Sequence, residues 1–282
     1  MPSSGWIRHK LDEDTVTRMY LEDKLSGQKI ARELGVSGQT IGRLLNGLGV
    51  RKRNRVEVNK TSWSQRVYPE VSINERQDQI IVGTLLGDGH VGTQASSVNP
   101  TFSVAHKELD KEYTLWKYNE LESTGLFRNP PFPRKKRFED GREFIRLGIR
   151  SLQHPILKEY RNLIYHGDKK VITLKVLERC NLLGLAVYYM DDGGLRREEW
   201  YYPEEPKVPC FYTYSYTQEE VVLLRYFLDS RWGIKAELKE IKYGTPRRPG
   251  RLLLVLEKSL PRFRELIVPY ILPITCMHRK IP

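Results

Sequence analysis

The sequence predicts an α+β protein in which two similar units follow a small all-α domain. Three observations lead to this fold class. Two pairs of similar segments recur at a nearly constant offset after residue 75, which indicates a duplicated unit of roughly a hundred residues. Within each unit, helical and alternating hydrophobic patterns follow one another in the order αββαββα. The chain before this region shows helical periodicity alone.

The duplication rests on two correspondences along the chain. The segment IIVGTLLGDGH (80–90) corresponds to LGLAVYYMDDGGL (183–195) at an offset of 104 residues. The segment GREFIR (141–146), with the Ser-Leu pair that follows it, corresponds to GRLLLV (250–255) at an offset of 108 to 109. Because both correspondences occur in the same order, we expect two units related by a pseudo-twofold axis.

The N-terminal region is expected to form three short helices. They run from Asp12 or Asp14 to Leu25, from Gly27 to Leu34, and from Gly38 to about Gly47. Their apolar faces give an expected core of Ile30, Ala31, Leu34, Val36, Ile41, Leu44 and Leu45. We therefore expect a helical domain over 1–55, a linker over 56–75, and the two repeated units over 76–173 and 174–282.

Residues 29–45, KIARELGVSGQTIGRLL, resemble the helix-turn-helix of resolvases and repressors. The resemblance implies DNA contacts from the second helix of the motif and from the basic run behind it: Ser37, Gln39, Thr40, Arg43, Arg51 and Arg53. The alternative is a three-helix bundle that only packs or binds protein.

Composition favours a nucleic-acid partner and excludes several classes. The 47 Lys and Arg against 35 Asp and Glu give a net charge of +12, which suits a polyanion, although a basic solvated surface gives the same excess. The three cysteines lack CxxC spacing, so we expect neither disulfides nor a zinc site. No apolar run is long enough for a membrane span, and no signal peptide opens the chain. We expect a protein of the cytoplasm, associated with the nucleoid, or of an organelle, and not a secreted one.

Basic clusters are expected at the hairpin turn of each unit. They are Arg134, Lys135, Lys136 and Arg137 in the first unit, and Arg247, Arg248 and Arg251 in the second. A charge run is commonly just a solvated surface. Because the two clusters occupy equivalent places, we expect them to contact DNA phosphates.

Each repeated helix ends in an acidic Asp-Gly, and this pattern suggests a metal site. Gly83 and Gly87 lie on one helical face, where a second helix can approach closely. If the two helices pack about the axis, Asp88 and Asp192 meet, and a divalent cation would relieve their repulsion. Mg2+ suits oxygen ligands and phosphate substrates, with Mn2+ as a substitute. The alternative is that each Asp-Gly only ends its helix.

The segments IVGTLLGDG (81–89) and LAVYYMDDG (185–193) resemble the two motifs of single-chain LAGLIDADG homing endonucleases. The resemblance covers about residues 76 to 282 and implies two pseudosymmetric αββαββα units with saddle-shaped antiparallel sheets. It implies that Asp88 and Asp192 bind the catalytic metals, with the backbone carbonyls of Gly87 and Asp191. It also implies a water-polarising lysine at the base of each half. These are Lys280 and either Lys170 or its neighbour Lys169, with Lys170 favoured.

The second motif departs from the family pattern, since Val187 stands where glycine is usual, and this predicts asymmetric helix packing. We expect structural, hydrogen-bonded roles for His90 and His106, with DNA or water contacts as the alternative.

The resemblance implies a function as a homing endonuclease carried by a mobile element such as an intron. Such an enzyme cuts both strands of double-stranded DNA at a long site and leaves short 3′ overhangs. We expect a monomer with no membrane association and no obligate protein partner. The alternative is a non-cleaving transcription regulator or an intron RNA maturase on the same fold, but such forms are expected to lack the acids that are present here.

Overall fold

The computed structural model describes residues 11–54, 56–58, 67–95, 97–137, 141, 143–197, 207–241 and 250–282. The chain divides into two compact units, one formed by residues 1–67 with 94–98 and the other by residues 68–93 with 99–282. Among the described helices, none combines the length and the apolar character needed to cross a membrane.

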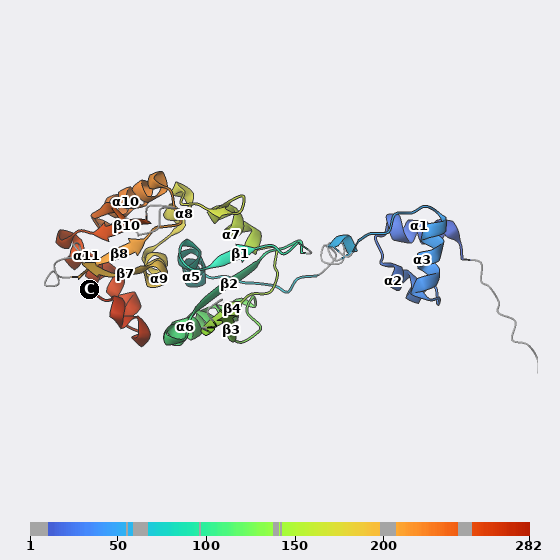
Figure 1. Ribbon diagram of the computed structural model, residues 1–282, viewed down its shortest axis with the longest axis horizontal. Helices are drawn as coiled ribbons and strands as arrows, with labels where there is room; N and C mark the ends of the chain where they lie inside the picture. The colour runs from blue at the N-terminus through green and yellow to red at the C-terminus, as the bar shows by residue number, and fades with distance from the viewer. Residues whose placement is uncertain are drawn as a thin grey trace, which may run out of the picture. The chain divides into compact units, whose positions relative to one another are not determined.

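The helices α1 (Glu13–Leu21), α2 (Gly27–Glu33) and α3 (Gly38–Gly47) belong to the N-terminal unit (Figure 1). Each begins at a residue whose side chain accepts a backbone N–H of the first turn, namely Asp12, Ser26 and Ser37. Helix α1 ends before the expected Leu25, because the chain turns at Lys24, which has a left-handed φ of 57°.

The core of this unit lies where the three helices meet. The buried residues are Val16, Met19, Tyr20, Ile30, Ala31, Ile41 and Leu45. Three residues expected in the core, Leu34, Val36 and Leu44, are only partly buried. Four of the seven predicted core residues are therefore buried, and the other buried residues of this unit come from α1.

The larger unit has the αββαββα order twice, as predicted. The first half contains α5 (Glu75–Leu86), β1 (His90–Gly92), β2 (Thr101–Lys107), α6 (Lys111–Leu121), β3 (Phe132–Arg137), β4 (Glu143–Arg150) and α7 (Leu157–Ile164). The second half contains α9 (Leu182–Asp192), β7 (Gly193–Arg197), β8 (Lys207–Tyr212), α10 (Gln218–Trp232), β9 (Ala236–Ile241), β10 (Gly250–Val255) and α11 (Leu260–Ile271).

Short elements that the sequence did not predict join or close the two halves. They are the turns η1 (Glu108–Asp110), η2 (Glu122–Thr124) and η3 (Glu257–Ser259), the hairpin β5 (Tyr165–His166) and β6 (Lys169–Lys170), helix α8 (Leu174–Arg179), and the C-terminal η4 (Thr275–Lys280). The hairpin and η4 matter for function because each carries one of the predicted lysines.

Each half contains a four-stranded antiparallel sheet with the same strand connectivity. The orders are β1-β2-β4-β3 and β7-β8-β10-β9. The first hairpin begins at Phe132, so the run from Arg134 to Arg137, which was expected at the hairpin turn, lies in strand β3 instead. Positive charge on every residue did not prevent strand formation, since β4 pairs with the whole run.

Helices α5 and α9 lie side by side at the centre of this unit, between the two sheets (Figure 1). A side chain at Gly83 would overlap the carbonyl oxygen of Gly184 on the facing helix, so this position requires glycine. The second helix has its small residue at Gly184, three residues before Val187, which explains how the packing tolerates valine there. One hydrophobic core extends across both halves.

Candidate metal centre and nucleic-acid interface

The ends of α5 and α9 bring three carboxylates together. Asp88 follows α5, whereas Asp191 and Asp192 end α9. A side chain at Gly87 would overlap the Cβ of Asp191, so the glycine makes room for this aspartate. The backbone N–H of Asp88 donates to Oδ2 of Asp191 at 3.3 Å. The two duplicated motifs therefore meet at their acidic ends, as the sequence predicted.

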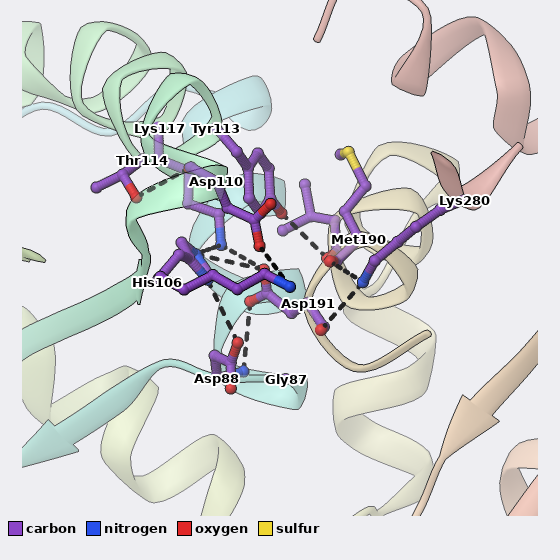
Figure 2. A network of polar contacts seen from close by, with 12 residues as sticks. Gly87, Asp88, His106, Asp110, Tyr113, Thr114, Lys117, Met190, Asp191 and Lys280 are labelled. Carbon is purple, nitrogen blue, oxygen red and sulfur yellow. Dashed lines mark hydrogen bonds and ion pairs between the residues drawn. The ribbon is translucent and has the colours of Figure 1, made fainter. Parts of the chain in front are cut away.

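Asp191 is the centre of a buried polar cluster (Figure 2). Its Oδ1 lies 2.7 Å from Nζ of Lys117 on α6, and both side chains are completely buried. His106 of β2 lies between the two acids, with Nε2 at 3.7 Å from Oδ1 of Asp191 and Nδ1 at 3.3 Å from Oδ2 of Asp88. The cluster belongs mainly to the first half, because only Asp191 comes from the second.

The three carboxylates interact electrostatically at this junction. Burial raises the pKa of Asp192 to about 7, and the negative charges of Asp88 and Asp191 act in the same direction. Burial also opposes ionisation of Asp88, but the hydrogen bond and charge of His106, with those of nearby lysines, hold the pKa of Asp88 below its usual value. Asp88 is also more accessible, with 46% of its side chain exposed.

This donor set fits a divalent cation. Ligand atoms from Asp88, His106 and Asp191 lie within 4.8 Å of one another. Oxygen donors on converging carboxylates suit Mg2+ or Mn2+. Burial and the negative charges of Asp88 and Asp191 raise the pKa of Asp192 more than Lys170 and Lys280 lower it, and a bound cation would add positive charge that favours the ionised carboxylate. Among the described residues, this cluster includes the predicted Asp88 but not the predicted Asp192, and it contains the carboxylate of Asp191, of which only the backbone carbonyl was expected. It also adds His106, which the sequence analysis expected to be structural.

Both predicted lysines reach the motif helices. Nζ of Lys170 donates to the carbonyl oxygen of Gly87 at 2.6 Å. Nζ of Lys280 donates to the carbonyl oxygen of Met190 at 2.5 Å and lies 3.4 Å from that of Asp191. Lys169 points away, since it is exposed on the same short strand. The structure thus separates two neighbours that the sequence could not.

Burial alters the acidity of both lysines. It lowers the pKa of Lys280 to about 8, although Asp191 acts in the opposite direction. It also lowers the pKa of Lys170, against the effect of Asp192. A lysine with a lowered pKa exchanges its proton more readily near neutral pH, which suits a group that handles a proton of water.

Lys117 is the main site residue that sequence reasoning missed. It lies in a charged helix, where lysine is normally solvated, and nothing local distinguishes it. His90 is exposed, and its Nδ1 lies 3.0 Å from the hydroxyl of Tyr165, so the expected hydrogen bond is present.

The outward face of the first sheet carries a row of cations. Lys107 of β2 is the cross-strand neighbour of Arg146 of β4, which in turn is the neighbour of Arg134 of β3. Like charges directly opposite one another on a sheet repel, so this row suits a polyanion lying across the strands. Lys107 and Arg146 were not predicted, because they lie outside the basic runs.

The other predicted DNA contacts have different surroundings. Gln39 and Arg43 are exposed on α3, whereas the hydroxyl of Ser37 caps the helix by accepting the backbone N–H of Thr40 and lies 2.8 Å from the Thr40 hydroxyl. Arg53 donates to backbone carbonyls near Leu25 and lies over the ring of Tyr20.

Several remaining basic residues make contacts within the chain or lie outside the residues that the structure describes. Arg51 pairs with Glu57. Arg251 is 3.8 Å from Glu240 and donates to the carbonyl oxygen of Tyr216. Lys135 and Arg137 are exposed on β3, and Lys136 pairs in register with Phe144. Arg247 and Arg248 lie outside the described residues.

Comparison with known proteins defines the family. Residues 78–260 match the LAGLIDADG DNA endonuclease family, and the chain belongs to it. It is 27% identical over 222 residues to the DNA endonuclease I-ChuI of Chlamydomonas applanata, covering 75% of this chain and 96% of that protein.

The chain is also similar to an mRNA maturase and to a RecA protein. The cytochrome b mRNA maturase bI2 of Saccharomyces cerevisiae is 22% identical over 227 residues, which cover 76% of this chain and 49% of the maturase. A protein RecA of Mycobacterium shimoidei is 26% identical over 208 residues, which cover 71% of this chain and 45% of that protein. This chain therefore spans about half the length of these two relatives.

A solved structure supports the fold. The homing endonuclease I-WcaI, bound to its DNA recognition sequence, superposes with a TM-score of 0.65 and 19% identity, covering 84% of this chain and 96% of that one. The predicted fold of two αββαββα halves is thereby confirmed.

Proposed function

We propose that this chain is a site-specific homing endonuclease that hydrolyses both strands of double-stranded DNA with a divalent metal ion. The observation that carries the proposal is the junction of α5 and α9. There Asp88 and Asp192 lie at the C-terminal ends of equivalent helices, and a partly buried lysine bonds to the backbone beside each acid. We further propose a long, asymmetric recognition site, cleavage that leaves short 3′ overhangs, and action as a monomer.

The proposed roles follow from the chemistry of each side chain. Asp88 and Asp192 hold the cation, together with the neighbouring carbonyls of Gly87 and Asp191. Bound Mg2+ or Mn2+ supplies positive charge to the scissile phosphate and acidifies a water molecule. Lys170 and Lys280 orient the attacking water at their respective sites, and their lowered pKa values suit proton exchange. Each strand cut consumes one water molecule and breaks one phosphodiester bond.

His106 extends this set in the first half. Because Nδ1 of His106 lies 3.3 Å from the carboxylate of Asp88, it fixes the orientation of that acid or adds a nitrogen ligand.

The cationic row of Lys107, Arg134 and Arg146 is the proposed phosphate-binding surface. Lys135, Lys136 and Arg137 on the same hairpin, and Arg247, Arg248 and Arg251 in the second half, extend this role. Phosphate contacts would position the duplex, while other side chains on the sheets read base edges.

The N-terminal helices form a second proposed DNA-binding module. Gln39 and Arg43 are exposed on α3 and free to enter a major groove, and Ser37 and Thr40 lie at the start of the same helix. Arg51 and Arg53 flank this surface, and they approach phosphate only if their internal contacts are exchanged. This module lengthens the recognition site or reads an operator of its own gene.

A plasmid assay tests the proposal. The plasmid carries the host locus with the insertion containing this gene removed, and it is incubated with the purified chain and Mg2+ or Mn2+. We expect linear product, which should disappear when EDTA removes the metal. Tight DNA binding without cutting in either metal would contradict the proposal.

The second candidate is a non-cleaving regulator or an intron RNA maturase. The similarity to a yeast mRNA maturase favours keeping it. In that case the chain would bind the cognate intron RNA or an operator more tightly than the insertion-free locus. Asp88 and Asp192 argue for cleavage, because a chain that only binds has no need of both acids.

A further inference from the structure

Lys170 and Lys280 are partly buried and lie on short segments outside the two four-stranded sheets, and each segment is held by a glutamate of the opposite half. Lys280 ends η4, in the second half. Oε1 of Glu112, on α6 of the first half, accepts the backbone N–H of Thr275 at 2.8 Å, and Oε2 accepts that of Cys276 at 2.8 Å. A single carboxylate therefore caps the turn that ends in Lys280.

A second contact ties the same turn to the first half. The guanidinium of Arg279, next to Lys280, lies 2.8 Å from the carboxylate of Asp110. The carbonyl oxygen of Lys280 also accepts a hydrogen bond from Tyr189 of α9 at 2.8 Å. Contacts from both halves thus hold the backbone at Lys280, whose ammonium group donates to the carbonyl oxygen of Met190.

The other lysine has the equivalent arrangement in reverse. Lys170 belongs to the first half, and the N–H of Ile172, two residues later, donates to Oε1 of Glu220 at 3.1 Å. Glu220 lies on α10 of the second half, where its Oε2 accepts the N–H of Thr217 and closes a capping box.

The duplication relates these two contacts. Glu112 and Glu220 are 108 residues apart, which is the offset found between the repeated segments, and each lies in the first turn of the helix that follows its half's first strand pair. Each lysine bonds to the motif helix of its own half, but its anchor comes from the other half.

We propose that Glu112 and Glu220 are reciprocal positioning residues, each of which holds the water-orienting lysine of the opposite half in place. This inference rests on the proposed role of Lys170 and Lys280 in cleavage. The cutting of each strand would then depend on residues from both halves. We predict that Glu112 and Lys280 affect the cutting of one DNA strand, and that Glu220 and Lys170 affect the cutting of the other.

The test measures cleavage of each strand separately. A duplex that the wild-type chain linearises is labelled at either 5′ end, and single-turnover nicking is followed in Mg2+ for Glu112→Gln, Glu220→Gln, Lys280→Ala and Lys170→Ala. Gln keeps the size of Glu but offers one acceptor oxygen instead of two. Because a misplacement of about 1 Å can reduce a rate 100-fold, we expect each Gln variant to slow one strand by roughly 10- to 100-fold. DNA affinity measured without metal should stay unchanged.

Thr275→Pro provides an independent variant at the first site. Proline removes the N–H that Glu112 accepts, and it is well tolerated at the first position of a helical turn that follows an extended residue such as Ile274. It should slow the same strand as Glu112→Gln. Two exposed acids at the far ends of the same helices serve as controls, and Glu122→Gln and Asp229→Asn should cut both strands at the wild-type rate.

The outcomes separate the two proposals. Suppose that each lysine variant slows the cutting of one strand. If the glutamate variants then cut both strands at the wild-type rate, or slow both strands equally, the positioning role is wrong and the proposed endonuclease site stands. If the lysine variants themselves cut at the wild-type rate, the proposed role of the lysines fails and the positioning role fails with it. Matching strands within each Glu and Lys pair would support the inference.

Discussion

At the scale of single residues, the buried pair of Lys117 and Asp191 distinguishes this site from a simple meeting of two acids. It connects α6 of the first half to the end of α9, and nothing in the local sequence could reveal it, because residues 74 positions apart meet only in the folded chain. By contrast, Asp88, Asp192 and Lys280 could be proposed as site residues from the sequence, since short motifs with fixed positions carry them.

Removal of Lys117 should destabilise the larger unit. Lys117→Met would leave the carboxylate of Asp191 buried without its cation, at a cost of about 3–5 kcal/mol in the free energy of unfolding. Urea unfolding in EDTA measures this change, with the exposed Lys111→Met as the control. Adding Asp191→Asn should restore part of the loss, and a double variant that is no more stable than Lys117→Met would contradict this account.

At the scale of elements, the fold was largely predictable because periodicity and the duplication both pointed to it. The αββαββα order and the contact between the two motif helices were predicted correctly. The β5–β6 hairpin, α8 and η4 were not, because segments of two to six residues are too short to show a period. The basic run from Arg134 to Arg137 was expected at a hairpin turn but lies in strand β3, because a run of four basic residues shows no strand-like alternation.

The contact between α5 and α9 should not accept a side chain at Gly83. Gly83→Ala would place its Cβ against the backbone of Gly184, and we expect a loss of about 1–3 kcal/mol in stability. Cleavage should fall as well, because the acids at the helix ends would move apart. Thermal unfolding and the plasmid assay measure these two effects, and unchanged stability of Gly83→Ala would argue against the tight contact.

Gly47→Ala, at an exposed position of α3 with open space around it, should instead stabilise the N-terminal unit by about 0.5–1 kcal/mol, which thermal unfolding also measures.

At the scale of the whole molecule, the positive charge and the duplication both favour binding of duplex DNA. Duplication places two similar half-sites about one axis, and the net charge of +12 favours a polyanion over the sheets. The halves are not equivalent, however, because His106 and Lys117, which both contact Asp191, come from the first half. We therefore expect the two strands to be cut at different rates.

Deletion of residues 1–55 should weaken DNA binding without abolishing metal-dependent cutting, since the proposed catalytic residues all lie in the larger unit. The slope of log Kd against log salt concentration should fall by about 0.9 for each phosphate contact that is lost. Binding titrations at several salt concentrations measure this. Unchanged affinity after the deletion would show that the N-terminal unit plays no part in recognising this DNA.

The central claim is that Asp88 and Asp192 hold the metal that cuts DNA, and the most direct test compares cutting with binding in the two asparagine variants. Asp88→Asn and Asp192→Asn keep the size of each side chain but remove the negative charge. The account predicts that each variant binds the target duplex with nearly wild-type affinity and makes no double-strand break in Mg2+. Double-strand cleavage at the wild-type rate by either variant would contradict it.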